Sequence, residues 1–170
     1  MNKKYTIYTD GSSNNHIPAE QRDGGWAFLV LNKNDEFLYR SSGYAESATS
    51  QRMEMTAVIE ALGWFVKNIY DQYRSELFTV TIMTDSMYIV QCFKDRWYKR
   101  WIDIDYVGVK NVDLWKELLN FNTQFSRMSV RYIHVRGHSG HQWNEEVDRL
   151  SGETRISKKG IVKQNCFGYE

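Results

Sequence analysis

Hydrophobic and polar positions follow two different rhythms along the chain, and these rhythms predict its secondary structure. Alternation over a few residues rich in β-branched and aromatic side chains is typical of strands, whereas apolar residues three or four positions apart are typical of helices. Strands are expected at 4–9, 26–32, 36–43, 77–84 and 129–135. Helices are expected at 50–70, from Ser86 onward, at 112–122 and at 144–153, with irregular structure at 13–25 and 94–111.

The order of these elements predicts an α/β fold. Three strands come first and are joined by short connections, so they are expected to be antiparallel. Strands and helices then alternate, which favours parallel pairing of the later strands. The prediction is a central mixed five-stranded sheet flanked by helices, in a single domain over 1–155. A short basic tail over 156–170 follows, and its main interpretation is a disordered end.

Composition excludes several classes of protein. The 170 residues are 42% hydrophobic and 15% aromatic with a net charge of +1, unlike a disordered chain or a protein that binds polyanions through bulk charge alone. Cys92 and Cys166 are too few and too far apart for a disulfide scaffold. They predict free thiols in a reducing compartment, and a single disulfide between them is the alternative. No stretch approaches the roughly 20 apolar residues of a membrane span, and the N-terminal stretch lacks the apolar core of a signal peptide. We expect a cytoplasmic monomer that contacts no membrane.

Two aspartates follow predicted strands. Asp10 comes after the first strand and Asp85 comes after the strand at 77–84. In open α/β sheets, sites lie at the carboxyl ends of strands, so the two carboxylates would converge there. The alternative is that each is an ordinary turn or helix-capping residue, because aspartate is common in both positions.

Glu54 lies on the apolar stripe of its own predicted helix. The residues three, four, seven, eight and eleven positions further on are Ala57, Val58, Ala61, Leu62 and Phe65. A buried carboxylate costs several kcal/mol unless it is paired or bound to a cation. One explanation is therefore a salt bridge, with Arg52 or Arg149 as the partner, and the other is a metal site.

The last predicted helix adds Glu145 and Asp148, which lie on one face because they are three residues apart. An acidic face of this kind is often only solvated. Together, however, Asp10, Glu54, Asp85 and Asp148 could form an oxygen-rich cluster that would repel itself without a hard divalent cation. Two Mg²⁺ ions about 4 Å apart in such a cluster would activate water and stabilise the leaving oxygen of a phosphodiester.

Five motifs in sequence order resemble type 1 ribonuclease H, the enzymes that cut the RNA strand of an RNA–DNA hybrid. The resemblance covers about residues 4–152, and five ordered motifs are far more specific than any one of them. The motifs are Tyr8-Thr9-Asp10-Gly11-Ser12, Gln51-Arg52-Met53-Glu54-Met55, Met83-Thr84-Asp85-Ser86, Lys110-Asn111-Val112-Asp113-Leu114-Trp115, and Gly137-His138-Ser139-Gly140-His141 followed by Asn144, Glu145 and Asp148.

The resemblance implies a ribonuclease H-like fold and a two-metal hydrolysis that leaves 5′-phosphate and 3′-hydroxyl ends. Asp10, Glu54, Asp85 and Asp148 match the four catalytic carboxylates of the family, which hold two Mg²⁺ ions, with Mn²⁺ as a possible substitute. Glu54 would also lie near the ribose 2′-hydroxyl, the group that distinguishes RNA from DNA. His138 matches a mobile histidine that assists proton transfer or product release, and Glu145 matches an acidic residue that modulates it.

The resemblance also implies contacts with the hybrid substrate. Thr49, Arg52 and Asn111 match a pocket for a DNA phosphate, and Asn14 and Asn15 are candidates for the minor groove. The segment 94–101 matches a basic protrusion that grips the DNA strand, although Asp103 and Asp105 stand where many relatives carry lysine. The candidate contacts in this segment are Lys94, Arg96, Trp97, Lys99, Arg100 and Trp101.

Each of these interpretations has an alternative. The segment 94–101 is also compatible with a helix that packs its tryptophans and presents a solvated basic face. The chain as a whole could be a catalytically silent binding module or a DNA-cutting relative such as a resolvase. Retention of all four carboxylates argues against the first. The His138 loop and the Arg52-Met53-Glu54 motif argue against the second.

Overall fold

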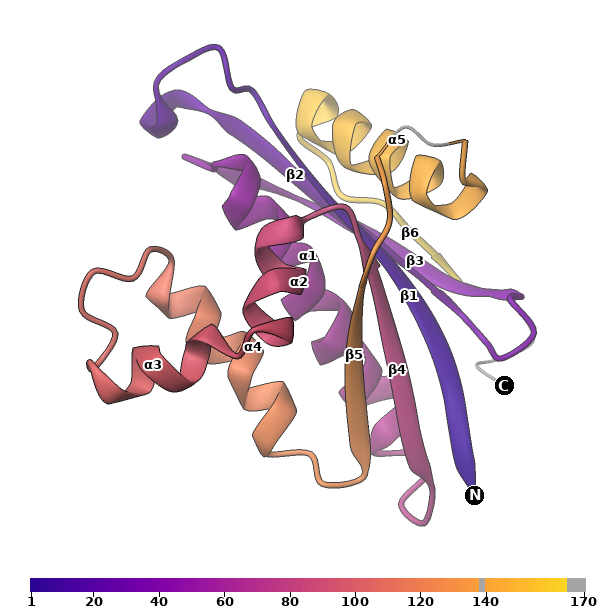
Figure 1. Ribbon diagram of the computed structural model, residues 1–170. Coiled ribbons are helices and arrows are strands. Elements are labelled where there is room, and N and C mark those ends of the chain that lie inside the picture. The colour runs from indigo at the N-terminus through magenta and orange to yellow at the C-terminus, as the bar shows by residue number, and fades with distance from the viewer. Residues whose placement is uncertain (138–139, 165–170) are drawn as a thin grey trace.

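The computed structural model describes residues 1–137 and 140–164, and over these residues six strands form one mixed sheet (Figure 1). The order across the sheet is β5-β4-β1-β2-β3-β6. Strand β1 pairs antiparallel with β2, and β2 with β3, whereas β4 pairs parallel with both β1 and β5. The strands are β1 (Asn2–Ser13), β2 (Asp23–Leu31), β3 (Phe37–Glu46), β4 (Leu77–Thr84), β5 (Met128–His134) and β6 (Val162–Gln164).

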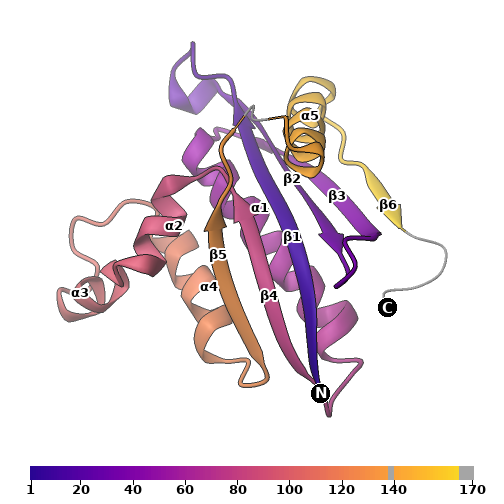
Figure 2. The same ribbon diagram turned by 45° about the vertical axis from the view of Figure 1, so that its right-hand side comes forward.

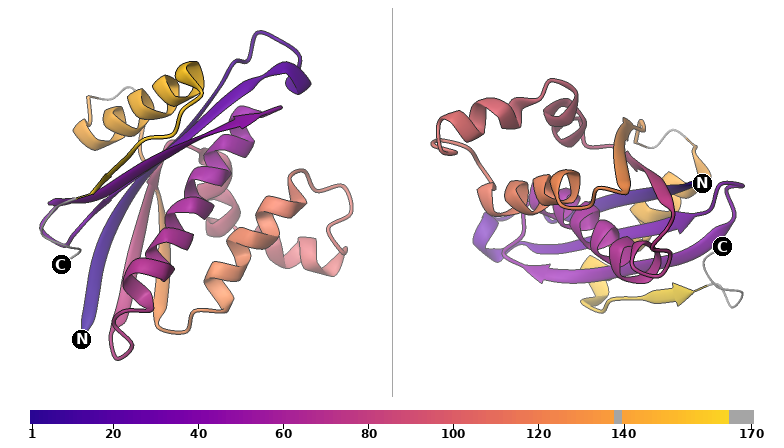
Figure 3. Two further views of the ribbon diagram at one scale, coloured as in Figure 1. Left: turned by 180° about the vertical axis from the view of Figure 1, so that it is seen from behind. Right: turned by 90° about the horizontal axis from the view of Figure 1, so that it is seen from below.

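Helices cover both faces of the sheet. Helix α1 packs on β1 and β2 from one face, and α5 packs on β1, β2 and β3 from the other, as Figures 2 and 3 show. Helix α4 lies beside α1, and α2 with α3 extends outward from the β4–β5 side. The helices are α1 (Ser50–Phe65), α2 (Met87–Lys94), α3 (Trp97–Asp103), α4 (Val112–Thr123) and α5 (Gln142–Ser157), with a π-helical turn η2 (Val66–Tyr70) after α1 and a short 3₁₀ turn η1 (Ala19–Gln21).

Strand β2 explains why this three-layer arrangement is stable. Its residues alternate between two cores: Phe28 and Val30 pack in the larger cluster under α1, whereas Ala27, Leu29 and Leu31 pack under α5. A strand buried on both faces reads as a continuous apolar run rather than an alternating one. The apolar run at 26–31 is therefore the central strand of the fold.

The predicted order of three strands followed by alternating helices and strands is confirmed, and so is the mixed sheet. The strand count was wrong, because the tail contributes β6, which pairs antiparallel with β3. Contacts at the sheet edge place it. The Ser42 amide donates a hydrogen bond to the Ile161 carbonyl, the Ile161 amide donates one to the Ser42 hydroxyl, and Gly160 lies against the Ser42 carbonyl. A three-residue strand with exposed side chains has no hydrophobic pattern that sequence could display.

The expected irregular segment at 94–111 was also partly wrong, since α3 occupies Trp97–Asp103. This helix begins after Arg96, which adopts left-handed backbone angles, and no side chain caps it. Without a capping residue, the start of the helix carried no sequence signal. No helix in residues 1–137 and 140–164 is long and apolar enough to cross a membrane.

Candidate active site

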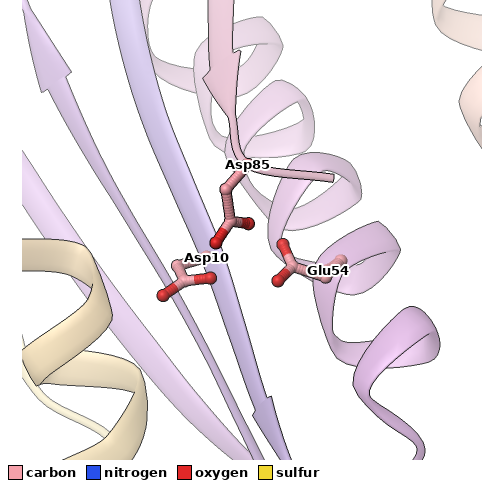
Figure 4. A group of neighbouring side chains, drawn as sticks. All are labelled: Asp10, Glu54 and Asp85. Carbon is pink, nitrogen blue, oxygen red and sulfur yellow. The ribbon is translucent and has the colours of Figure 1, made fainter. Parts of the chain in front are cut away.

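Asp10 and Asp85 lie close together, one on β1 and the other directly after the adjacent parallel strand β4 (Figure 4). The register of β1 against β4 runs to the pair Tyr8 and Met83, and the two aspartates lie two residues further along each strand. Asp85 directly follows β4, as expected, but Asp10 lies inside β1 rather than after it. Strand β1 continues to Ser13 because its pairing with β2 extends beyond the end of β4. Asp10 therefore projects from a rigid, paired strand, and it is only 4% exposed.

Glu54 reaches the same place from the start of helix α1. Thr49 caps this helix, its Oγ1 accepting a hydrogen bond from the Arg52 amide at 3.2 Å, and the helix begins at Ser50 as predicted. Gly11 lets the helix approach the strand closely. A Cβ at Gly11 would lie 2.7 Å from the Cβ of Met53 and closer still to the amide nitrogen of Glu54. This approach places Glu54 beside Asp10.

The three carboxylates form a compact cluster. One oxygen of each of Asp10, Glu54 and Asp85 lies within 4.8 Å of one from each of the others. The proposed salt bridge to Glu54 is excluded, because Arg52 pairs with Asp113 at 2.7 Å and Arg149 pairs with glutamates of its own helix. Among the described residues, the buried Oε2 of Glu54 has no hydrogen-bond partner.

Burial and mutual repulsion shift the proton affinity of this cluster. Burial, followed by the charge of Asp85, raises the pKa of Asp10 to about 8. The same two causes, burial first and then the charge of Asp10, raise the pKa of Glu54 well above its usual value. Closely spaced carboxylate oxygens with an unpartnered buried atom are a donor set for a hard divalent cation. The residues present fit such an ion, which would offset the repulsion that otherwise favours protonation.

Asp148 interacts with Asp10 from the helix on the face of the sheet opposite α1. It lies on α5 and is exposed, and it approaches Asp10 closely enough to raise the pKa of that carboxyl by a side-chain hydrogen bond and by its charge. Glu145 lies one turn earlier and is exposed, with its amide donating to the carbonyl of His141. His138 lies outside the described residues.

Two contacts around this cluster were not anticipated. Gly137 lies against Asp85, since a Cβ there would be 3.3 Å from Oδ2 of the aspartate. The hydroxyl of Tyr8 lies 3.3 Å from Nε2 of His141, which connects β1 to the start of α5. A glycine within a motif is a weak signal of close approach, but no sequence pattern relates Tyr8 to a residue so distant in the chain.

Thr49, Arg52 and Asn111, the predicted phosphate-binding residues, are brought together. Arg52 donates to Oδ1 of Asn111 at 3.2 Å, and Asn111 adopts left-handed backbone angles just before α4. The partner that sequence reasoning missed is Asp113, which accepts two hydrogen bonds from the Arg52 guanidinium. Asn15 is linked to the same corner, because its Oδ1 accepts from the Ser50 hydroxyl at 3.0 Å. Asn14 is half-buried nearby in the chain, after the end of β1.

The basic and aromatic residues in and between α2 and α3 differ in their exposure to solvent. Trp97 and Trp101 are half-buried and contact each other, and Trp101 also packs on Trp115, with ring centroids 5.1 Å apart. Lys94, Arg96, Lys99 and Arg100 are all exposed. The tryptophans thus support a projecting helix whose cations face solvent.

Comparison with known proteins assigns the chain to a family. Residues 2–155 match the family model described as RNase H. The chain belongs to the ribonuclease H family. A curated ribonuclease H from Chlorobium luteolum is 34% identical over 164 residues, which cover 94% of this chain and 99% of the relative.

Solved structures of the family share the fold. LC9-RNase H1, described as a type 1 RNase H with the type 2 active-site motif, superposes with a TM-score of 0.77 at 22% identity, covering 98% of this chain and 80% of that one. LC11-RNase H1, solved in complex with RNA/DNA hybrid, superposes with a TM-score of 0.68 at 17% identity, covering 91% and 98%. The predicted family and fold are confirmed.

Proposed function

We propose that this ribonuclease H family member is an endoribonuclease that hydrolyses the RNA strand of RNA–DNA hybrids and leaves 5′-phosphate and 3′-hydroxyl ends. The main support is the cluster of Asp10, Glu54 and Asp85, in which Oε2 of Glu54 has no hydrogen-bond partner among the described residues. The match to the RNase H family model adds to it. The relative LC11-RNase H1, whose fold this chain shares, was solved with an RNA/DNA hybrid bound. This supports the hybrid as the substrate class.

Asp10, Glu54, Asp85 and Asp148 would hold two divalent cations, and Mg²⁺ suits carboxylates that share ligation with water and phosphate. Bound cations would supply an activated water and neutralise the charge that develops on the leaving oxygen. The chain's own contribution is position. Asp10 is fixed by the pairing of β1 with β2, Asp85 directly follows the paired strand β4, and Glu54 is fixed by the close approach of α1 to Gly11. Mn²⁺ would be accepted by the same oxygens.

His138 and Glu145 are proposed to handle protons beside this cluster. A neutral imidazole can accept a proton near physiological pH, and a nearby carboxylate would favour its protonated form. Glu145 is exposed at the start of α5, one turn before Asp148, and is available for this modulation.

The DNA strand is proposed to contact the other polar groups. Thr49, Arg52 and Asn111 offer a hydroxyl, a guanidinium and an amide to one phosphate, and such donors position a duplex without reading its sequence. Asn14 and Asn15 are proposed for the minor groove. The exposed cations Lys94, Arg96, Lys99 and Arg100 would track the DNA backbone, with Trp97 and Trp101 supporting them.

We further propose that the protein acts as a monomer in the cytoplasm. Cys92 is a buried free thiol, and burial raises its pKa to about 12, as suits a structural cysteine in a reducing compartment.

One assay tests this function against its alternatives. Labelled RNA–DNA hybrid, RNA duplex, DNA duplex and single-stranded RNA are each incubated with the protein, with Mg²⁺ or with EDTA. Mg²⁺-dependent cleavage of the hybrid alone is expected. Binding of the hybrid without cleavage in Mg²⁺ or Mn²⁺ would instead identify a silent binding module, and cleavage of DNA duplex would identify a DNA-cutting relative.

A further inference from the structure

Helix α5 approaches the sheet closely at Gly25. A Cβ at Gly25 would lie 2.9 Å from the amide nitrogen of Arg155 and closer still to the carbonyl oxygen of Ser151. Gly25 on β2 is the cross-strand partner of Ser12 on β1. Arg155 therefore lies directly over Ser12, and its Nε donates a hydrogen bond to the Ser12 hydroxyl at 3.0 Å.

This hydrogen bond leaves most of the Arg155 guanidinium available. Arg40 and Arg52, which are half-buried like Arg155, each pair with a carboxylate. Arg149, on the same helix, pairs with two glutamates. In the portion of the chain that the structure describes, Arg155 pairs with no carboxylate, and its terminal amino groups have no hydrogen-bond partner. A half-buried cation whose one contact is a neutral hydroxyl is suited to receive an anion.

Ser12 and Arg155 each lie near one of the carboxylates along the chain, Ser12 near Asp10 on β1 and Arg155 near Asp148 on α5. Ser12 is two residues beyond Asp10 and so lies on the same face of β1, about 7 Å along the strand. Arg155 is seven residues beyond Asp148 and lies on the same side of α5, about 10 Å along the helix. The hydrogen bond between Ser12 and Arg155 therefore lies beyond Asp10 along the strand and beyond Asp148 along the helix.

We propose that Arg155, held in place by Ser12, binds a backbone phosphate of the RNA strand close to the scissile linkage. The proposal rests on the proposed function, because the strand that is cut must lie against the carboxylates. The planar guanidinium can offer both terminal amino groups to one phosphate, and the bond from Nε to Ser12 fixes the orientation of that plane. The phosphate belongs to the RNA strand, since the pocket of Thr49, Arg52 and Asn111 proposed for DNA is built on the α1 side of the sheet.

The first measurement is the salt dependence of hybrid binding. Cleavage by the unsubstituted chain is confirmed beforehand, so a failure of the proposed function is detected separately. Binding is then measured by fluorescence anisotropy with Mg²⁺ in an Asp85→Asn background, which prevents turnover. Arg155→Ala is expected to weaken binding about tenfold at low salt and to reduce the slope of log Kd against log salt by about one. Arg149→Ala, the matched control on the same helix, is expected to leave the slope unchanged.

A second measurement identifies the phosphate and excludes a purely structural role for Arg155. Single neutral methylphosphonate linkages are placed at successive positions in either strand, and each hybrid is bound by the parent and by Arg155→Ala. The effect of Arg155→Ala should disappear at one RNA-strand linkage beside the scissile position. Arg155→Lys should keep the salt slope but recover only part of the affinity, because a point charge cannot make the planar contact.

An unchanged salt slope in Arg155→Ala, or coupling confined to DNA-strand linkages, overturns the proposal. Thermal unfolding of each variant shows whether the loss of the Ser12 hydrogen bond has displaced α5. If Arg155→Ala does not fold, Arg155→Lys and Ser12→Ala carry the same test. If neither of these variants loses its effect on binding at any neutral RNA-strand linkage, the contact between Arg155 and an RNA phosphate is rejected.

Discussion

The backbone of Gly11 lies against helix α1 at Glu54, so one glycine allows a strand carboxylate and a helix carboxylate to meet. Asp10 precedes this glycine on β1, and Glu54 begins the second turn of α1. The distance between the two acidic side chains is therefore controlled by a residue that has no side chain. Substitution at Gly11 tests whether the approach is required.

Gly11→Ala should lower both stability and cleavage. The added Cβ meets backbone atoms of α1, which cannot move aside as a flexible side chain could, so overpacking of about 1–3 kcal/mol is expected. Urea unfolding and hybrid cleavage measure the two effects. Gly63→Ala is the control, because a Cβ there meets nothing within 4 Å and alanine favours the helix by about 0.5–1 kcal/mol. Full activity in Gly11→Ala would show that Glu54 tolerates a displaced helix.

Asp10→Asn should separate binding from cleavage. Asparagine keeps the shape but loses the negative charge, so cleavage should fall at least about a hundredfold while hybrid affinity changes little. The same change removes a carboxyl whose ionisation is disfavoured by burial and by the charge of Asp85, and it should raise the unfolding temperature in EDTA at neutral and higher pH. Steady-state cleavage, anisotropy and thermal unfolding are the three measurements. Retained cleavage would remove Asp10 from the active site.

The metal-free protein should lose stability as pH rises. Burial raises the pKa of Asp10 from 3.8 to about 8, so between these values the folded state holds a proton that the unfolded state has released. The contribution of Asp10 to stability therefore falls steadily across this window and is at its lowest above pH 8. The unfolding temperature of the parent minus that of Asp10→Asn, measured in EDTA, should decline over the same range.

Divalent cations should reverse this trend, because they replace the proton on the carboxylates. The stabilisation produced by Mg²⁺ should accordingly grow as pH rises toward about 8. If the unfolding temperature of the parent minus that of Asp10→Asn does not change with pH in EDTA, Asp10 ionises normally in the folded protein.

Lys99→Ala combined with Arg100→Ala should weaken hybrid binding. Both side chains are exposed on α3, and loss of two phosphate contacts should reduce the salt slope by about two. Anisotropy over a series of salt concentrations measures this. Lys67→Ala combined with Arg74→Ala removes the same charge beyond the opposite end of α1 from Glu54 and is the matched control. Equal slopes for the two double variants would place α3 away from the substrate.

Much of this fold was predictable because its elements are long and strongly patterned. The apolar run that forms β2 and the helical stripe that contains Glu54 each have a burial pattern that matches one type of element. The convergence of Asp10 with Asp85 was expected from parallel strands ending at one edge of a sheet, and it holds although β1 continues to Ser13. Family motifs then connected these residues to Asp148 on a distant helix.

The features that sequence did not predict depend on contacts between distant backbones. Strand β6 exists because an edge of β3 accepts it, and α3 is supported because Trp101 packs on Trp115 and Trp97 packs on Trp101. The ion pair of Arg52 with Asp113 decided against the salt bridge to Glu54, and no local pattern indicates which partner an arginine selects. The hydrogen bond from Arg155 to Ser12 likewise requires α5 to be docked on Gly25.

The four acidic side chains come from three layers: Glu54 from the helix on one face, Asp10 and Asp85 from the sheet, and Asp148 from the helix on the other face. A nascent or partly unfolded chain that lacks either helix layer has an incomplete acidic set. Nucleolytic competence would then arise only with the last docking event, so a misfolded copy could not degrade nucleic acid. With the proposed set of four carboxylates, cleavage would require both helices to be docked on the sheet, and cation binding would in turn hold the two outer layers together.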